Sequence, residues 1–258
     1  MTVQLSRRNI LKSTALAAAG FIPAAAAIAQ TTKIPSQWDE TTDIIIVGSG
    51  FAGLSAAVGA SNAGAKVIVL EKMPTIGGNS VINAGDMCAV GTPQQAAKNV
   101  KDSPELLAQD MLRNGLFLND PKKVKFVAEH ANDNYKWLVD EIGVEFMPVV
   151  GFTGGHSVPR AVTTTAGSGS GIIMPLAAYL KKKGIEPRTR NYVERIYRDD
   201  NGRVVGLCVR EGYRFGKEGS GRPKNIQATK AVLLAHGGFG ADVKYRSCLL
   251  YTSPSPRD

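Results

Sequence analysis

A glycine-rich turn constrains the fold of this chain more than any other feature of its sequence. Residues 43–71 read D-IIIV-GSGFAG-LSAAVGASNAGA-KVIVL-E. The apolar runs at the two ends have the β-branched character of buried strands, and the alanine-rich stretch between them repeats small apolar residues with a helical period. The segment therefore predicts a strand, a tight turn, a helix and a second strand, which together begin an α/β dinucleotide-binding fold.

The glycines of the turn, Gly48, Gly50 and Gly53, have the G-x-G-x-x-G spacing. The first permits the sharp turn, the second lets the backbone approach a pyrophosphate, and the third lets the helix pack on the strand. The helix N-terminus offers N–H groups and a positive dipole end to the phosphates. Glu71 closes the second strand, where an acid can accept hydrogen bonds from both hydroxyls of an adenosine ribose. A glycine turn without a ligand is the alternative, but the order of elements favours nucleotide binding.

The first 29 residues resemble an export signal. Ser6–Lys12 (SRRNILK) is similar to a twin-arginine motif, an apolar stretch follows it, and Ala27–Ala29 has the small-x-small form of a cleavage site. We therefore predict a twin-arginine signal peptide over residues 1–29, a linker over 30–42, and a periplasmic protein with no stable membrane span after cleavage. An uncleaved membrane anchor is the alternative, although the apolar stretch is short and alanine-rich for a spanning helix.

The last residues have the character of a non-native tail. Residues 248–258 read CLLYTSPSPRD, which resembles the in-frame translation of a sequencing-library adapter. We expect this tail to have no native packing, and we expect the folded domain, itself incomplete, to occupy residues 43–247. A natural Ser/Pro-rich tail is the alternative.

The composition excludes several classes of protein. The chain has 258 residues and a formal net charge of +9, to which Arg7, Arg8 and Lys12 of the signal contribute. Because no basic stretch is interleaved with aromatic residues, nucleic acid is not an expected partner. Before the tail the cysteines are Cys88 and Cys208, too few for a disulfide framework, and no C-x-x-C-H motif attaches a c-type haem. The three histidines lack the spacing of metal ligands, so no metal is expected.

The remainder of the chain alternates predicted helices and strands. Ser103 and Asp120 each precede a proline, which is typical of a helix N-cap, and the second of these helices should end near Gly143. A third helix is predicted over residues 172–183. Extended segments are predicted over residues 185–198, 203–210, 225–229 and 231–235. They indicate a β-meander followed by a buried strand that ends in a second glycine-rich loop, HGGFG.

Six segments resemble the flavoprotein of the fumarate reductase and flavocytochrome c family. They are DIIIVGSGFAGLSAA, VIVLEKMPTIGGNS, AGD, DSPELLAQDM, GGHSVPR and VLLAHGGFG, in this order. The resemblance implies an α/β, glutathione-reductase-like Rossmann domain with a β-meander, which binds FAD noncovalently. In the family a capping domain with the catalytic residues lies C-terminal to the HGGFG loop and is missing here, so the catalytic residues are unknown.

The resemblance also implies which residues contact FAD. They are Gly48, Gly50, Ala52, Gly53, Glu71, Lys72, Gly78, Asn79, Ser80, Ala84, Gly85, Asp86, Val193, Gly237 and Gly238. Val193 would face the adenine, and the last two glycines would approach the ADP moiety.

Three positions depart from the family pattern. Asp86 stands where the family has a second glycine beside the flavin, and Val162 begins a stretch that replaces the His-Arg-Pro-Thr run of fumarate-reducing members. His236 stands where threonine is common. The first two departures weaken the case for fumarate as the substrate.

The resemblance implies a periplasmic reductase that passes a hydride from reduced FAD to an activated C=C bond of a small, anionic acceptor. Its electrons would come from a separate donor, a periplasmic cytochrome. Two alternatives stay open: a flavin-dependent dehydrogenase of the ketosteroid type, and a FAD-binding fragment that does not turn over. A nicotinamide-only enzyme is disfavoured by the GGNS and HGGFG loops.

Overall fold

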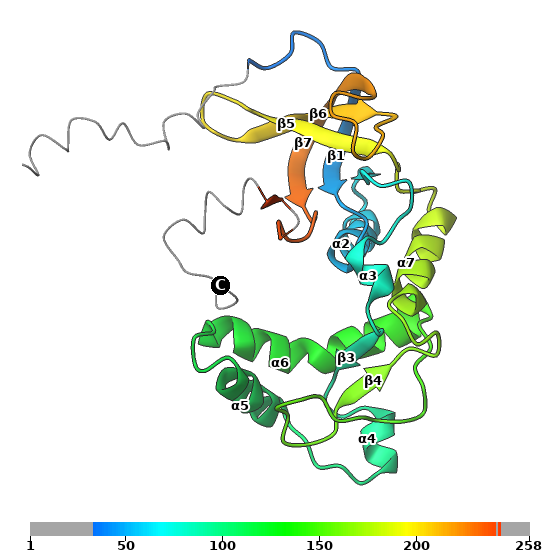
Figure 1. The fold of residues 1–258 in the computed structure, drawn as a ribbon, viewed down its shortest axis with the longest axis vertical. Coiled ribbons are helices and arrows are strands. Elements are labelled where there is room, and N and C mark those ends of the chain that lie inside the picture. Colours follow the sequence, from blue (N-terminus) through cyan, green and yellow to red (C-terminus); the bar gives the residue numbers. More distant parts are fainter. Residues whose placement is uncertain (1–32, 241, 244–258) are drawn as a thin grey trace, which may run out of the picture. The chain divides into compact units, whose positions relative to one another are not determined.

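A computed structural model describes residues 33–240 and 242–243 of the chain. Within these residues the strands form a five-stranded sheet of order β2-β1-β7-β6-β5 and a two-stranded sheet of β3 and β4 (Figure 1). The predicted signal peptide and the predicted adapter-like tail lie outside the described residues.

The first unit of the fold is the predicted strand–turn–helix–strand. It consists of β1 (Glu40–Val47), α2 (Phe51–Asn62) and β2 (Val67–Leu70). The strands β1 and β2 are parallel, with Ile44 opposite Val67. Because β1 begins at Glu40, the last three residues of the predicted linker belong to the sheet, and the folded domain begins earlier than position 43.

The β-meander is confirmed, but its last strand differs from the prediction. The strands β5 (Asn191–Arg198), β6 (Val204–Glu211) and β7 (Arg222–Leu234) pair antiparallel in sequence order. The two strands predicted over 225–229 and 231–235 are one strand, because β7 pairs with β6 in its first half and with β1 along most of its length. The register shifts between Thr42 and Ile44, where Asp43 of β1 lies opposite two residues of β7, Thr229 and Lys230.

Two of the predicted extended segments are wrong in extent. The segment expected over 185–198 forms a ladder strand only from Asn191, and before that Arg188 makes a single parallel bridge with Leu70. The strand expected over 203–210 is displaced by one residue and is β6.

The two faces of the β1–β2 layer bury different apolar clusters. Ile46 and Val69 pack with residues of α2 and of α7 (Ser170–Lys182) on one face. Ile45 and Ile68 pack on the other face with Leu207, Val209, Ile226 and Ala228 of the meander. Strands buried on both faces lose alternation and read as continuous apolar runs, which is why IIIV and VIVL were recognisable from sequence.

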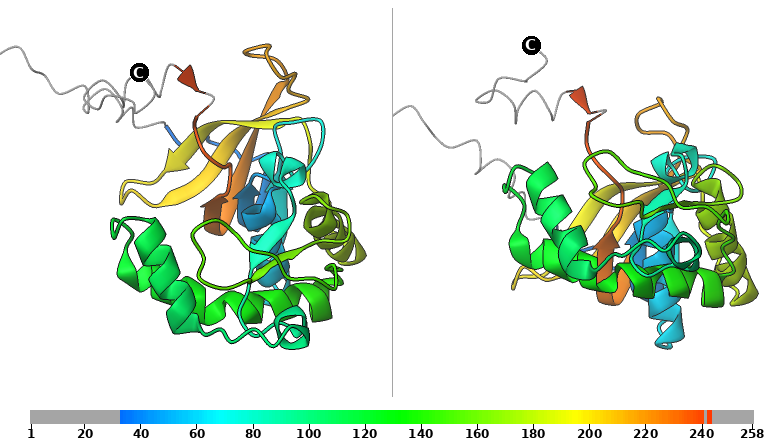
Figure 2. Two further views of the ribbon diagram at one scale, coloured as in Figure 1. Left: turned by 60° about the horizontal axis from the view of Figure 1, so that its bottom comes forward. Right: turned by 90° about the horizontal axis from the view of Figure 1, so that it is seen from below.

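The remaining described elements lie between β2 and α7 in the sequence. They are α3 (Asn79–Ile82), β3 (Asp86–Cys88), α4 (Pro93–Ala97), α5 (Pro104–Asn114), α6 (Pro121–Lys136), a π-helical turn (Trp137–Ile142) and β4 (Ala161–Thr163). Helices α5 and α6 lie side by side (Figure 2) and bury Leu107 against Ala128 and Ala131.

Both predicted N-caps are confirmed. The Ser103 side chain accepts a hydrogen bond from the Leu106 N–H, and the Asp120 side chain accepts one from the Lys122 N–H. The π-helical turn after α6 ends at Gly143, whose φ of +81° is the left-handed conformation that stops a helix. Along the described part of the chain, no helix has the length and apolar character needed to cross a bilayer.

Candidate functional site

The glycines of the first turn are required by close backbone approach. Gly48 has a φ of +104°, and a Cβ there would lie 2.4 Å from the carbonyl oxygen of Ala235. A Cβ at Gly53 would lie 1.9 Å from the carbonyl oxygen of Gly48. The turn therefore brings the end of β1, the start of α2 and the end of β7 into backbone contact, which leaves no room for side chains.

The N-terminus of α2 is suited to an anion. Its cap residue, Gly50, has no side chain that could cap the free N–H groups of the helix, and the first turn contains no acidic residue. Ala52 is exposed in this turn. The Phe51 N–H donates to the Ser80 hydroxyl at 3.1 Å, which joins the turn to α3. The first turn of α2 itself therefore carries no acidic side chain that would repel a pyrophosphate from the positive end of its dipole.

Glu71 is buried beside the turn and is already hydrogen-bonded. Its Oε2 accepts from the Ser49 N–H at 3.1 Å and from the Ser49 hydroxyl at 2.6 Å, and its Oε1 accepts from the Met73 N–H at 2.9 Å. A carboxylate oxygen can accept about two hydrogen bonds. Oε1 therefore retains capacity for one further donor, so this geometry can hold one ribose hydroxyl rather than two.

Ser49 is a site residue that sequence reasoning missed. Besides donating to Glu71, its hydroxyl accepts from the Gly77 N–H at 2.9 Å. It thereby fixes the GGNS loop against the glycine turn. Ser49 occupies a variable position of the G-x-G-x-x-G motif, so the motif itself carried no signal for it.

The GGNS loop lies at the start of α3. Gly77 and Gly78 have φ of +95° and +48°, and Gly78 is the cap of α3. Gly78 and Asn79 are exposed, while Ser80 reaches back to α2. The GGNS loop therefore lies beside the N-terminus of α2.

The second small-residue segment is joined to the start of α7. Gly85 has a φ of +76°, and a Cβ there would lie 2.4 Å from the Ser168 carbonyl oxygen. Ala84 and Asp86 on either side of it are exposed, and the Thr163 hydroxyl donates to Asp86 Oδ1. The carboxylate that departs from the family pattern thus stands at an open position.

Two other predicted contacts are less closely placed. Gly237 and Gly238 are exposed, and a Cβ on either would meet no described atom within 4 Å. The part of the HGGFG region that meets the turn is Ala235 and the Cα of His236, which lies 3.1 Å from a Cβ built on Gly48.

Two further predicted FAD contacts, Lys72 and Val193, differ in exposure. Lys72 is exposed, with its ammonium 5.7 Å from the centre of the Phe215 ring. Val193 is half-buried and packs against the cluster that contains Leu70. Their contacts with an adenosine stay predictions.

A buried ion cluster lies beneath the GGHSVPR loop. Arg160 is fully buried, and its Nε and Nη2 donate to Asp102 at 2.9 and 2.7 Å. Its Nη1 donates to Asp110 at 2.6 Å and to His156 Nδ1 at 2.9 Å. Burial alone would raise the pKa of Asp110, but hydrogen bonds from Ser157 and Arg160 outweigh it and hold the pKa at about 2. The protein therefore uses four of the five N–H donors of this arginine, which acts as a structural clamp.

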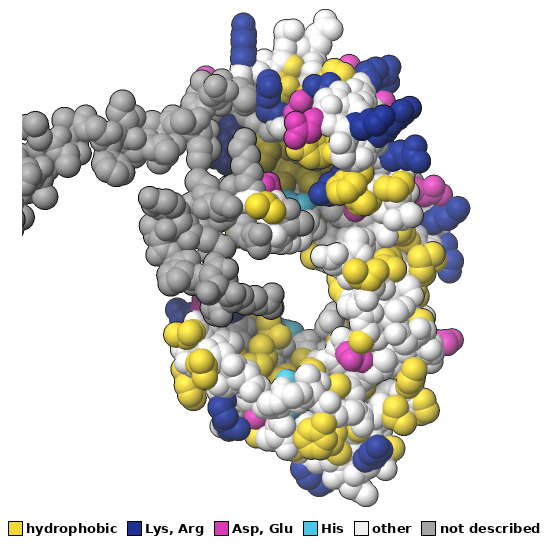
Figure 3. Space-filling view, viewed as in Figure 1, with side chains coloured by type: hydrophobic (Ala, Val, Ile, Leu, Met, Phe, Trp, Pro, Cys, Tyr) yellow, Lys and Arg dark blue, Asp and Glu magenta, His cyan; other side chains and the backbone are white. Residues whose placement is uncertain are grey.

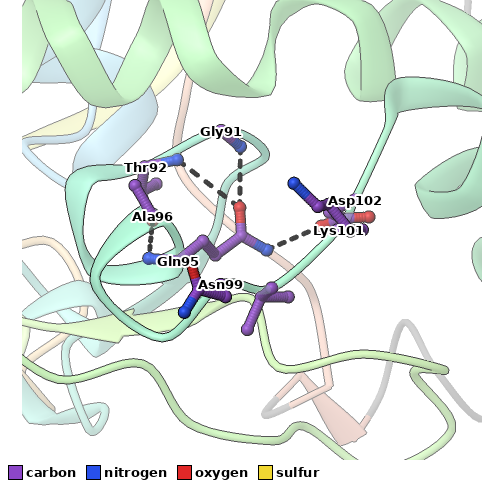
Figure 4. Close-up of a pocket in the computed structure, with 8 residues that line it drawn as sticks. Gly91, Thr92, Gln95, Ala96, Asn99, Lys101 and Asp102 are labelled. Atoms are coloured by element: carbon purple, nitrogen blue, oxygen red, sulfur yellow. Dashed lines mark hydrogen bonds between the residues drawn. The ribbon is translucent and has the colours of Figure 1, made fainter.

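A hollow of about 300 Å³ lies beside this clamp, lined by residues of the α4 region (Figure 4). Its central side chain, Gln95, is used by the protein itself. Gln95 Oε1 accepts from the Gly91 N–H at 2.7 Å, and Nε2 donates to Asp102 and to the Pro159 carbonyl, both at 2.8 Å. The hollow is not part of the glycine turn, and the protein itself uses its central side chain, so we do not assign it a ligand.

The glycine turn is therefore the best-supported ligand site among the described residues. No group of three or more His, Cys, Asp or Glu side chains in this part of the chain is arranged to hold a metal ion. Residues 43–253 match the sequence profile of the FAD-binding domain family. The chain belongs to this family. FAD is accordingly its cofactor, and the N-terminus of α2, the glycine turn and Glu71 have the chemistry that its pyrophosphate and ribose need.

Named relatives and solved structures agree with the predicted resemblance. The chain is 40% identical to the acrylate reductase flavoprotein subunit of Shewanella woodyi, covering 94% of this chain and 48% of that protein. It is 40% identical to a fumarate reductase (cytochrome) of Shewanella frigidimarina, covering 78% of this chain and 34% of that protein. The chain thus spans about half or less of the length of these relatives.

Two solved structures share the fold. The open conformation of a flavocytochrome c3 fumarate reductase superposes with a TM-score of 0.73 at 32% identity, over 98% of this chain and 40% of that one. A 3-ketosteroid-Δ4-(5α)-dehydrogenase from Rhodococcus jostii gives a TM-score of 0.72 at 26% identity, over 87% of this chain and 52% of that one. The predicted α/β FAD-binding fold of the fumarate reductase family is confirmed.

Replacement of Glu71 should weaken FAD binding measurably. We expect Glu71→Ala to cost about 1.5–3 kcal/mol of FAD-binding free energy, because it removes the carboxylate predicted to accept from the ribose and frees the Ser49 hydroxyl that this carboxylate holds. Flavin retention after dialysis measures this. Ser49→Ala is the control, since it frees the turn but keeps the carboxylate, and it should cost less. Equal flavin retention by Glu71→Ala and the unchanged protein would contradict the assignment.

Proposed function

We propose that the full-length protein is a FAD-dependent oxidoreductase that reduces an activated carbon–carbon double bond of a small, anionic acceptor. The observation that carries this proposal is the 40% identity to an acrylate reductase flavoprotein subunit over 94% of the chain. Noncovalently bound FAD supplies the hydride, while the protein supplies position and electrostatics. The chain's own part is to hold the pyrophosphate on α2, the ribose at Glu71, and the flavin near the segment Ala84–Asp86.

The exposed carboxylate of Asp86 bears on the choice of acceptor. If the flavin lies beside Asp86, this carboxylate would repel a second carboxylate on the acceptor. Such repulsion weakens the binding of a dicarboxylate more than the binding of a monocarboxylate. The proposal is therefore a monocarboxylate of the acrylate type rather than a dicarboxylate such as fumarate. The Thr163 hydroxyl, which donates to Asp86, would hold the carboxylate in this place.

Reoxidation of the reduced flavin tests the proposal. The full-length protein is reduced with dithionite without oxygen, and acrylate or fumarate is then added while the flavin absorbance is followed. We expect acrylate to reoxidise the flavin faster than fumarate. An Asp86→Gly variant should shift the ratio of the two rates toward fumarate. No reoxidation by either acid would contradict the proposal.

A ketosteroid dehydrogenase is the second candidate, because such an enzyme superposes almost as well as the fumarate reductase. It would run in the opposite direction and take hydride from a saturated steroid. Bleaching of the oxidised flavin by a saturated 3-ketosteroid, with no response of the reduced flavin to acrylate, would favour this candidate.

The electron donor is proposed to be a separate periplasmic cytochrome. The predicted twin-arginine signal over residues 1–29 would place the protein where soluble NADH is absent, and the chain carries no haem-attachment motif of its own. We expect NADH alone to leave the flavin oxidised, and a reduced c-type cytochrome to reduce it. Flavin reduction by NADH at the rate of turnover would contradict a cytochrome as the electron donor. Recovery of the protein in the cytoplasmic fraction would contradict the periplasmic location.

A further inference from the structure

The turn between α5 and α6 exposes three large apolar side chains in succession. Leu116, Phe117 and Leu118 are 77, 73 and 87% exposed. We call these residues the apolar tip. Phe126, in the second turn of α6, is 63% exposed as well. Figure 3 shows hydrophobic side chains beside Lys and Arg side chains at the α5–α6 end of the molecule. A cluster of this kind on a soluble surface indicates an interaction site.

The backbone of the apolar tip is held in an unfavourable conformation. Leu116 and Phe117 have φ of +50° and +58°, a region that bulky residues avoid. Hydrogen bonds keep them there: the Phe117 N–H donates to the Leu112 carbonyl at 2.8 Å, and the Leu118 N–H donates to the Gly115 carbonyl at 2.9 Å. Glycine would fit both positions better. Leucine and phenylalanine at these positions therefore contribute to something other than the fold of the turn.

A basic rim adjoins the apolar tip on α6. Lys122, Lys123 and Lys125 fall in the first two turns of the helix, and its first turn contains no acidic residue. Cations are unfavourable at this positive end of a helix. The Lys123 ammonium lies 3.9 Å from a carboxylate oxygen of Asp120, and the Lys125 ammonium lies 3.7 Å from one of Glu129. Two of these lysines therefore make long ion pairs. The Lys123 and Lys125 side chains are 84 and 73% exposed, so solvent screens these pairs strongly.

We propose that the apolar tip and its three lysines are the docking surface for a protein partner whose contact surface has an apolar centre with carboxylates around it. Such a partner would bury the three apolar side chains. Its carboxylates would oppose the three lysines, so the exposed apolar side chains and the crowded positive charge would both be relieved in one complex. An anionic membrane is disfavoured, because Asp120, Glu129 and Asp133 alternate with the basic residues along the same helix.

Photocrosslinking of the full chain in its native cells tests the partner. A photoreactive residue is placed at position 118 and, as the control, at position 174, where Met174 on α7 is 58% exposed. We expect an adduct from position 118 alone, with an acidic protein whose crosslinked residue lies among carboxylates. The adduct should be lost with Lys122→Glu/Lys123→Glu and in high salt, and kept with the control change Lys181→Glu on α7.

The variant Phe117→Gly separates binding from folding. Because glycine accepts the positive φ and the removed ring is mostly exposed, the melting temperature should be equal or higher, yet the adduct should disappear. The proposal is overturned by an adduct with the same chain, with a second copy, or with a basic or neutral protein. It is also overturned by no adduct, by an adduct that survives Phe117→Gly, or by tip-dependent binding to anionic vesicles in place of a protein.

Discussion

Replacing Arg160 by leucine should lower the free energy of unfolding by about 3–5 kcal/mol, because the change leaves buried carboxylates without their counter-charge. Asp102 and Asp110 are both fully or almost fully buried and both accept hydrogen bonds from this arginine. The clamp also reaches His156 of the GGHSVPR loop and, through Asp110, Ser157. Urea denaturation of the full chain measures the loss.

Two further variants show whether the stability lost in Arg160→Leu comes from an uncompensated buried charge or from lost packing. Arg222 makes an ion pair with Glu211, but its side chain is 79% exposed, so Arg222→Leu should cost no more than about 1 kcal/mol. Adding Asp102→Asn and Asp110→Asn to Arg160→Leu should restore part of the lost stability, since the uncompensated buried charges are then absent. If the triple variant is no more stable than Arg160→Leu, the loss comes from packing and not from charge.

The Arg160 cluster also makes the free energy of unfolding depend on pH. The pKa of Asp110 is held at about 2, below the value of about 3.9 for an unfolded aspartate. Its contribution to stability is therefore present above about pH 4 and is lost as the pH falls toward 2. In Arg160→Leu the hydrogen bonds from Ser157 remain but those of the arginine are lost, so the pKa of Asp110 should rise toward its unfolded value. The stability of that variant should therefore increase less between about pH 2 and pH 4 than the stability of the unchanged chain does.

This cluster also shows where sequence reasoning stops. A strand, a glycine turn, a capped helix and a terminal acid are local patterns, so the first unit and the N-caps could be predicted from short windows. Arg160 meets its partners across 58 and 50 residues, and in a sequence an arginine and two aspartates read as surface residues. Only the tertiary fold reveals that they are buried together.

The missed continuity of β7 has a similar cause. Lys230 interrupts the apolar pattern, which suggested two strands, yet one strand runs through because β1 pairs with β7 on both sides of Lys230. The same limit applies within the site. The glycines, Glu71 and Ser80 were accessible from the motif and the resemblance, but the hydroxyl of Ser49 gains its role only when Glu71 and Gly77 fold onto it.

Alanine at Gly53 should release the cofactor, whereas alanine at Gly59 of the same helix should not. A Cβ at Gly53 would lie 1.9 Å from the Gly48 carbonyl oxygen, so the backbone of the turn must move. Such overpacking costs about 1–3 kcal/mol or more. Because the displaced atoms are those that shape the pyrophosphate site, we expect FAD binding to weaken by about a hundredfold, which corresponds to about 2.7 kcal/mol.

Gly59 is the matched control, since it lies in the interior of α2 and a Cβ there would meet no described atom within 4 Å. Gly59→Ala should raise the free energy of unfolding by about 0.5–1 kcal/mol, because alanine loses less backbone entropy in a helix. Its affinity for FAD should be unchanged. Flavin titration of the apoprotein and thermal unfolding measure the two effects. If Gly53→Ala binds FAD as tightly as Gly59→Ala, the pyrophosphate does not lie on this turn, because no cofactor held there could tolerate the shifted backbone.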